Sequence, residues 1–205
     1  MTSNANSVNI KERDYHHGDL RAALLSAGMA ALDVAPVEAL SLRALAREAG
    51  VSATAVYRHF PDKDALLAAL ALAALDRMGR DQQAAADAVP ASAGPEAAFC
   101  ATGAAYARFA IQHPALFRLI WRTAPAGDVL SGPIESAEVA MQCLRRSVAA
   151  VLPTGASPQQ QRDLALRCWA LVHGLAMLVL EGQVQMDDAD IDRVIGGMIP
   201  QLRNN

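Results

Sequence analysis

The run from Ser41 to Leu67, SLRALAREAGVSATAVYRHFPDKDALL, predicts two short helices joined by a tight glycine turn and followed by a third helix. Leu42 and Leu45 begin an apolar stripe at helical spacing. Gly50 stands where the first helix must end, because the position just past a last turn often needs a positive φ. Pro61 stops the second helix after about two turns. A helix that short depends on packing for its stability, which is typical of a helix-turn-helix that presents one helix to a DNA major groove.

Polar residues at the expected helix starts support the same arrangement. Ser41, Ser52 and Asp62 are each placed to cap a helix by accepting a hydrogen bond from a backbone N–H. Within the second helix, Val56 and Phe60 lie four positions apart and are expected to point inward. The other side of this helix is then the candidate DNA-reading surface, and it carries Ala53, Thr54, Tyr57 and Arg58.

These residues resemble the DNA-binding signature of the TetR family of transcriptional regulators. The resemblance is strong over residues 15 to 75 and weak over the remainder of the chain. The segment from Leu20 to Ala31 is similar to the first helix of the family, in which Gly28 would allow a close helix contact. The matching positions of the helix-turn-helix are Ala46, Ala49, Gly50, Val51, Ser52, Val56, Tyr57, His59, Phe60, Lys63 and Leu66.

The resemblance implies a role for each polar position on this surface. Tyrosine, histidine and lysine side chains would bind phosphate oxygens, the lysine together with the backbone amides at the start of the third helix. Threonine or alanine could touch a thymine methyl group, and arginine could bind O6 and N7 of guanine. The phosphate candidates are Tyr57, His59 and Lys63, the base-edge candidates are Ser52, Ala53, Thr54 and Arg58, and Arg43 on the preceding helix could reach backbone or groove.

Ordinary surface chemistry is the alternative for these side chains. His59 could pack beside Phe60, and Arg43 could simply be solvated. Residues 1–65 contain seven Lys or Arg and eight Asp or Glu, so the segment is not basic overall. Attraction to phosphates must therefore come from a local cluster of cations, and nonspecific DNA binding should be modest.

Composition favours helices throughout the chain. Alanine and leucine dominate, aromatic residues make up 4%, and few stretches alternate with a period of two. We therefore expect an all-α protein, in which the third helix continues to about Arg80 and QQAAADAVPASAGPE forms a loop. The expected organisation is a disordered tail (1–14), a helix-turn-helix DNA-binding domain (15–62), a connecting helix (63–80) and a larger C-terminal helical regulatory and dimerisation domain (81–205).

The longest apolar stretch is WALVHGLAMLVL, residues 169–180, which is shorter than the roughly 20 residues that a bilayer requires. It is expected to be a buried helix with two apolar faces, one for its own subunit and one for a second copy of the chain. The alternative is that both faces pack inside one subunit. The candidate dimer residues, on this helix and on a final one, are Leu164, Cys168, Leu171, Leu175, Leu178, Ile191, Val194, Ile195 and Met198.

Trp169, His173 and Gly174 resemble the Trp, His and Gly signature of one TetR-like C-terminal domain. In this family the C-terminal module usually binds a small molecule that changes the spacing of the two DNA-reading units, so the resemblance implies a largely apolar effector. Plain core filling is the alternative role for every bulky residue of this module. The candidate effector residues are Phe99, Tyr106, Phe109, Phe117, Trp121, Met141, Trp169, His173 and Met177.

The sequence carries no pattern typical of an enzyme. No phosphate loop, nucleophile elbow or metal-ligand cluster is found, and Cys168 and His173 would point to different faces of their helix. No cofactor or metal is therefore expected. The net charge of −3 and the absence of a signal peptide predict a cytoplasmic protein without membrane contact. The remaining alternative is an all-helical small-molecule-binding or interaction protein that has lost operator binding.

Overall fold

The computed structural model describes residues 20–123, 127–130 and 139–203, and these ranges contain helices but no strand. The all-α prediction is confirmed, whereas the tail expected for residues 1–14 lies outside the described residues. The helices are α1 (Leu20–Val34), α2 (Leu42–Glu48), α3 (Ala53–His59), α4 (Lys63–Asp87), α5 (Gly94–Gln112), α6 (Pro114–Thr123), α7 (Val139–Val151), α8 (Pro158–Leu180) and α9 (Asp188–Arg203), with short 3-10 turns η1 (Val37–Ala39) and η2 (Ala91–Ala93).

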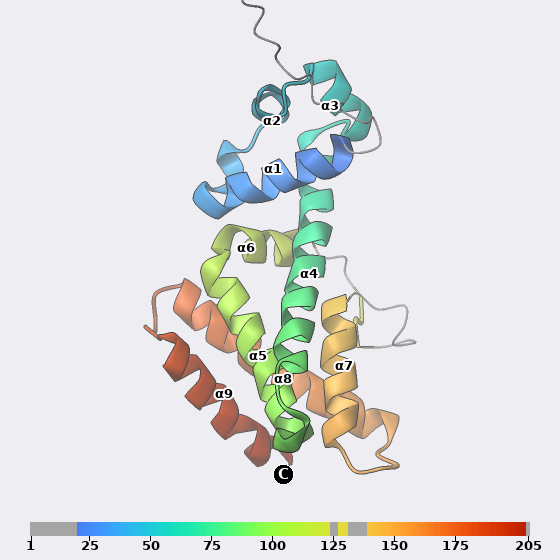
Figure 1. The fold of residues 1–205 in the computed structure, drawn as a ribbon, viewed down its shortest axis with the longest axis vertical. Helices are drawn as coiled ribbons and strands as arrows, with labels where there is room; N and C mark the ends of the chain where they lie inside the picture. The colour runs from blue at the N-terminus through green and yellow to red at the C-terminus, as the bar shows by residue number, and fades with distance from the viewer. Residues whose placement is uncertain (1–19, 124–126, 131–138, 204–205) are drawn as a thin grey trace, which may run out of the picture.

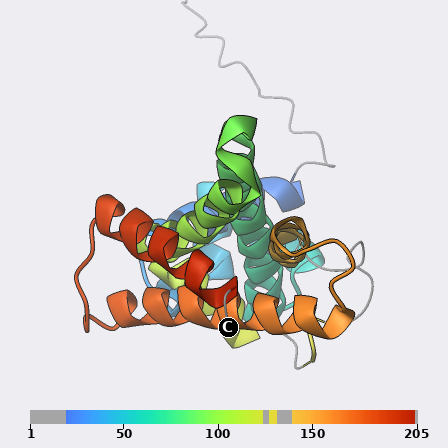
Figure 2. The same cartoon turned by 90° about the horizontal axis from the view of Figure 1, so that it is seen from below.

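The helices form two groups along the long axis of the molecule (Figure 1). We refer to α1–α3 as the head and to α5–α9 as the body. Helix α4 begins beside α3 in the head and runs down into the body, where it packs against α5, α6 and α7. Seen from the far end of the body, α8 lies across one side and α9 returns beside its second half (Figure 2). One continuous helix therefore connects the head to the body.

Helix α4 is longer than the sequence predicts. The carboxylate of Asp62 accepts a hydrogen bond from the Ala65 N–H at 2.7 Å, as expected for the cap, but the helix continues past Arg80 to Asp87. The predicted loop, residues 82–96, is therefore wrong for residues 82–87, and also for residues 94–96, where α5 begins. Glutamine and alanine are good helix formers, and Gln82 is buried against α5, where its amide donates to the Thr102 carbonyl at 3.4 Å.

One of the three hydrophobic clusters of the described residues, which we call the main core, extends from the head into the body. Leu24 of α1, Leu70 of α4 and Leu116 of α6 are fully buried in it. Gly28 brings α1 close to α4, since a Cβ at this position would lie 2.9 Å from Cδ2 of Leu70. The close helix contact expected at Gly28 is therefore present, and the head rests directly on the body.

A second glycine contact, between α4 and α7, leads to a stability prediction. A Cβ on Gly79 would lie 2.5 Å from the backbone nitrogen of Ala140 and 2.9 Å from the Val139 carbonyl carbon. Gly79→Ala is expected to lower the free energy of unfolding by about 1–3 kcal/mol, because helix α7 must move to admit the methyl group. Urea unfolding monitored by circular dichroism measures this change.

Gly197→Ala is the matched control for that substitution. Gly197 also lies inside a helix, but a Cβ there would meet nothing within 4 Å among the described residues. This variant should gain up to about 1 kcal/mol from the better helix propensity of alanine. Equal changes in the free energy of unfolding of the two variants would contradict the close packing proposed at Gly79.

Helix α8 contains the long apolar stretch that the sequence predicts to be a helix. The helix spans Pro158–Leu180, so it carries residues 169–180 together with Leu164 and Cys168, and by length and composition alone it could cross a membrane. Only 22% of its most apolar 18-residue window is buried in the subunit, so a large part of the helix is left uncovered by its own chain. Burial of the second apolar face by another copy of the chain stays a prediction. One side of α8 packs on the core, and the other side presents apolar side chains outward.

Candidate nucleic-acid interface and effector site

The turn between α2 and α3 has the geometry that its residues predict. The Ser41 hydroxyl accepts from the Ala44 N–H at 3.1 Å, and the Ser52 hydroxyl accepts from the Ala55 N–H at 3.2 Å. Gly50 adopts a φ of 68°. Each helix end is thus held by local hydrogen bonds, which determine the angle at which α3 leaves the turn.

Helix α3 has one buried and one exposed side. Val56 is completely buried and Phe60 is 2% exposed, as predicted, so both anchor the helix to the head. Tyr57 is 42% exposed although it is a large aromatic residue. The outward side chains of this helix are Ala53, Thr54, Tyr57 and Arg58, all of them exposed. Helix α3 therefore offers a polar surface at the end of the molecule farthest from the body (Figure 1).

The remaining DNA-binding candidates differ in how they are placed. Arg43 is exposed on α2, and His59 is half-buried next to Phe60 in the chain. The Ser52 hydroxyl accepts one hydrogen bond in the α3 cap, so its proton and its second lone pair remain for a base. The ammonium group of Lys63 donates to the Glu38 carbonyl at 3.2 Å, a long-range contact that no local pattern predicts. This bond holds Lys63 beside the start of α4 and leaves further donors on its nitrogen.

An additional cation lies beside the recognition helix. The Arg21 guanidinium group stands over the Phe60 ring, 5.5 Å from the ring centroid. Stacking on an aromatic face positions a guanidinium while leaving its N–H groups available. The charge balance of the sequence predicts a local cluster of cations, but only the fold shows that Arg21 of α1 reaches the end of α3.

Five of the nine effector candidates come together where α5, α6 and α8 meet. The Tyr106 hydroxyl and Nδ1 of His173 are 2.8 Å apart, so one hydrogen bond joins α5 to α8. Ring centroids of neighbouring members lie between 5.2 and 6.5 Å apart. We refer to this group as the aromatic cluster, and its members are Tyr106, Phe117, Trp121, Trp169 and His173.

The other four candidates are not part of this group of ring contacts. Phe99 is buried in a separate cluster against which Met141 packs. Phe109 is buried beside His113, with ring centroids 5.1 Å apart. Met177 is half-buried at the edge of the main core. Residue size and helical position suggested these side chains, but only the packing distinguishes them from the aromatic cluster.

The polar atoms of the aromatic cluster are uncharged at neutral pH. Burial raises the pKa of the Tyr106 hydroxyl well above its usual range, and the indole group of Trp169 partly opposes this rise. Burial also lowers the pKa of His173. The Trp121 N–H is buried without a hydrogen-bond partner among the described residues. The cluster thus combines apolar rings with a few neutral hydrogen-bonding atoms.

The lowered pKa of His173 predicts acid sensitivity of folding. The unfolded chain takes up a proton below the ordinary histidine pKa of about 6.5, whereas the folded chain takes it up only at lower pH. The free energy of unfolding should therefore decrease as pH falls below about 6.5. Thermal unfolding at several pH values measures this slope, and His173→Gln should reduce it. Parallel curves for the two proteins would contradict the prediction.

The structure divides the predicted dimer residues into two groups. Leu164, Cys168, Ile191 and Ile195 are at most 5% exposed inside their own subunit, so they are unavailable to a second chain, contrary to the sequence expectation. Their apolar spacing reflects contacts with other helices of the same body. Leu171, Leu175 and Val194 are half-buried and Leu178 is exposed, while the side chain of Met198 lies outside the described residues.

The outward side of α8 is nevertheless apolar. Leu166 and Leu178 are 48% and 46% exposed. Between them, Ala170 is exposed and a Cβ on Gly174 would meet nothing within 4 Å among the described residues. We refer to Leu166, Ala170, Gly174 and Leu178 as the outer α8 face. Small residues at its centre would allow another helix to approach closely.

The fold and the α3 surface define a helix-turn-helix DNA-binding protein with a larger helical body. Residues 24–70 match the family model described as bacterial regulatory proteins, tetR family. Residues 99–202 match the tetracyclin repressor-like C-terminal domain, a segment that contains the Trp169, His173 and Gly174 signature. The chain therefore belongs to the TetR family of transcriptional regulators, as its helix-turn-helix residues predict.

Solved structures share the fold of this chain. A protein of unknown function from Rhodococcus sp. RHA1 is 33% identical, with a TM-score of 0.73 over 94% of this chain and 98% of its own. A TetR transcriptional regulator from the same source is 20% identical, with a TM-score of 0.54 over 93% and 97% of the two chains. A TetR-family transcriptional regulator from Streptomyces coelicolor is 19% identical, with a TM-score of 0.63 over 90% and 80%. These last two similarities concern the fold alone. A comparison with curated proteins found no match.

Proposed function

We propose that the protein is a ligand-responsive repressor that binds a pseudo-palindromic operator as a homodimer. The observation that carries this proposal is the exposed polar side of α3, held between the Gly50 turn and the Asp62 cap at the end of the molecule. A rigidly presented helix of this kind fits the major groove of DNA. Helix α4 then connects this reading surface to the body.

The side chains of the head divide into phosphate and base contacts in this proposal. Tyr57 and Lys63 bind phosphates, together with the N–H groups at the start of α4. Arg58 and Thr54 reach base edges, where an arginine can recognise guanine through two hydrogen bonds. Arg43, Ser52, Ala53 and His59 complete the contact surface. The domain division near residue 62 is retained, with the connecting helix now extended to Asp87.

The homodimer is proposed to form through the outer α8 face. This face exposes two leucines on either side of Ala170 and Gly174, and burying them against the same face of a second chain would remove apolar surface from water. Leu171, Leu175 and Val194 would border the contact. A two-fold dimer then presents two α3 helices to successive major grooves, about 34–36 Å apart.

The effector is proposed to bind at the aromatic cluster. Its rings suit a largely apolar small molecule, and the Trp121 N–H and the Tyr106–His173 pair could orient one polar group. Separating α6 from α8 would change how α4 is held, and with it the spacing of the two heads. The ligand lowers operator affinity only as far as it prefers the DNA-incompatible state. The protein acts in the cytoplasm without a cofactor.

Selection of bound sequences from random double-stranded DNA tests the proposal. The purified full chain should enrich two-fold symmetric sequences whose half-sites are about one helical turn apart. Tyr57→Ala is the control, since loss of an exposed side chain leaves the core intact and should weaken binding to every sequence. If, at low salt, the wild type enriches no sequence more strongly than the Tyr57→Ala variant does, operator binding is refuted.

A further inference from the structure

A groove lies between the head and the body, where α6 runs beside the end of α1 (Figure 1). One wall is the chain from the last turn of α1 through η1, residues 32–38, and the other wall is α6. Its volume is about 560 Å³, within the range of about 300–1,000 Å³ that is typical of small-molecule sites. We refer to it as the head–body groove. None of the members of the aromatic cluster lines it, so it is a separate site.

The head–body groove has an apolar floor. Leu32, Val37 and Leu119 line it, and each is at most 9% exposed. Val34 lines it as well, but this side chain is 87% exposed. Covering these residues with an apolar group would remove their surface from water. The groove can therefore hold the apolar part of a ligand.

Two arginines of α6, one helical turn apart, give the groove its positive charge. Nη2 of Arg118 donates to the Glu181 carboxylate at 2.8 Å and to the Leu180 carbonyl at 3.2 Å, which leaves further donors on this guanidinium. Arg122 is held more loosely, because its Nη1 lies 4.0 Å from the Glu38 carboxylate, beyond hydrogen-bond distance. Both side chains of that pair are largely exposed, at 52% and 77%, so their attraction is weak.

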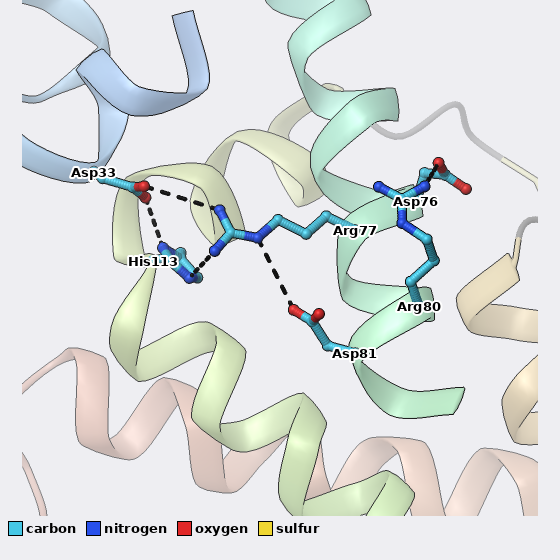
Figure 3. A network of polar contacts seen from close by, with 6 residues as sticks. All are labelled: Asp33, Asp76, Arg77, Arg80, Asp81 and His113. Atoms are coloured by element: carbon cyan, nitrogen blue, oxygen red, sulfur yellow. Dashed lines mark hydrogen bonds and ion pairs between the residues drawn. The ribbon is translucent and has the colours of Figure 1, made fainter. Parts of the chain in front are cut away.

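The acidic residues of the groove have less to offer a ligand. The Asp33 carboxylate accepts from Nδ1 of His113 at 2.6 Å and lies 3.9 Å from Nη1 of Arg77 (Figure 3). Its charge is therefore already matched within the protein. Glu38 is the other carboxylate of the groove, and its exposed side chain can turn into the solvent. A ligand cation would meet this one carboxylate, whereas a ligand anion would meet two guanidinium groups.

We propose that the head–body groove binds a small amphipathic carboxylate, with the acid group on Arg122 and Arg118 and the apolar chain on the floor. A carboxylate can accept two parallel hydrogen bonds from one guanidinium group. These bonds would replace the weak contact between Arg122 and Glu38. The site is additional to the effector site proposed at the aromatic cluster.

An occupant of the groove would contact the head and the body at once. It would hold η1 against α6, and the Glu38 carbonyl of η1 is the group that accepts from Lys63 at 3.2 Å. The ligand would therefore act on the wall that positions a proposed phosphate contact. This consequence rests on the proposed operator binding, whereas binding of the carboxylate does not.

Isothermal titration calorimetry of the full chain with octanoate tests the proposal. Octan-1-ol is the reference compound, since it has the same chain length without the charge. Octanoate should bind about tenfold more tightly than octan-1-ol, and Arg122→Gln should remove this advantage. Arg80→Gln is the matched control, because Arg80 is an exposed arginine that pairs with Asp76 away from the groove. Its octanoate affinity should equal that of the wild type.

Substitutions of Val34 locate the bound octanoate. The 87% exposure of this residue means that the fold tolerates a charged side chain there. Compared with Val34→Gln, Val34→Lys should tighten octanoate binding and Val34→Glu should weaken it, each by about threefold. Octanoate should also shift the backbone amide NMR signals of Val34 and Ala115, which lines the groove, but not that of His173 in the aromatic cluster.

Several results would overturn the proposal. These are no binding of octanoate at millimolar concentration, an octanoate affinity that Arg122→Gln leaves unchanged, and equal affinities of Val34→Lys and Val34→Glu. Amide shifts confined to the aromatic cluster would place octanoate at the other site and would equally contradict the groove. None of these measurements uses DNA, so their outcome is independent of whether an operator is found.

Discussion

Replacing Leu178 by aspartate is expected to convert the proposed homodimer into monomers and to weaken the proposed operator binding by about 10²- to 10⁴-fold. The leucine side chain is 46% exposed in the subunit, so an aspartate is tolerated there by the single chain. In a two-fold contact it would place two carboxylates in an apolar interface, where burying an unpaired charge is costly. A monomer binds only one half-site. It therefore loses the increase in affinity that two linked half-site contacts provide, which is about 10²- to 10⁴-fold. Sedimentation velocity and operator titration measure the two effects.

Leu72→Asp is the matched control for this substitution. Leu72 is 56% exposed on α4, away from the outer α8 face, so the same chemical change is made at a similarly exposed leucine. The control variant should remain dimeric and bind the operator normally. A Leu178→Asp protein that stays dimeric would place the subunit contact elsewhere. Loss of the dimer in both variants would indicate general destabilisation instead.

The second large effect is expected at Arg58. This side chain is exposed on α3 and has the donor geometry to recognise guanine with two hydrogen bonds. Arg58→Ala should therefore cost about 1–3 kcal/mol per half-site and relax the preference at particular operator positions. Selection from random DNA followed by competition titrations measures both the affinity and the lost discrimination.

Two other variants separate base reading from general attraction. Tyr57→Ala should weaken binding to all sequences alike, since a phosphate contact carries no base information. Arg80→Ala removes the same positive charge from an exposed position on α4, where the arginine pairs with Asp76. It should leave both affinity and preference unchanged. An Arg58→Ala protein that keeps the wild-type preference would remove Arg58 from the set of base contacts.

The helix caps and the glycine turn of the head could be predicted from residues that are close together in the sequence. Each cap of α2, α3 and α4 is a hydrogen bond to a backbone N–H three residues further on, and these are formed by Ser41, Ser52 and Asp62. Gly50 takes the left-handed conformation that its position requires. Such contacts depend on a few neighbouring residues, so the order of residue types is enough to anticipate them.

The sequence-based predictions failed where one residue pattern is compatible with more than one structure. The Gln and Ala residues before Asp87 have no strong apolar stripe, yet they continue α4 because they favour helix and pack on α5. Helix α8 is apolar on several sides, so its sequence does not show which side faces the core. The spacing of Leu164 and Cys168 predicts a dimer contact, whereas α5 and α7 cover these two residues within the subunit.

The residue order by itself determined the helical class, the helix-turn-helix and the family, because these depend on periodicity, caps and glycine over a few neighbouring positions. Only the tertiary structure decided that Lys63 reaches the Glu38 carbonyl, that Tyr106 meets His173, and that Asp33, Arg77 and His113 meet in one polar network (Figure 3). Those partners lie 25 to 80 residues apart in the chain. Their contacts follow from how whole helices pack, which a pattern within one helix does not contain.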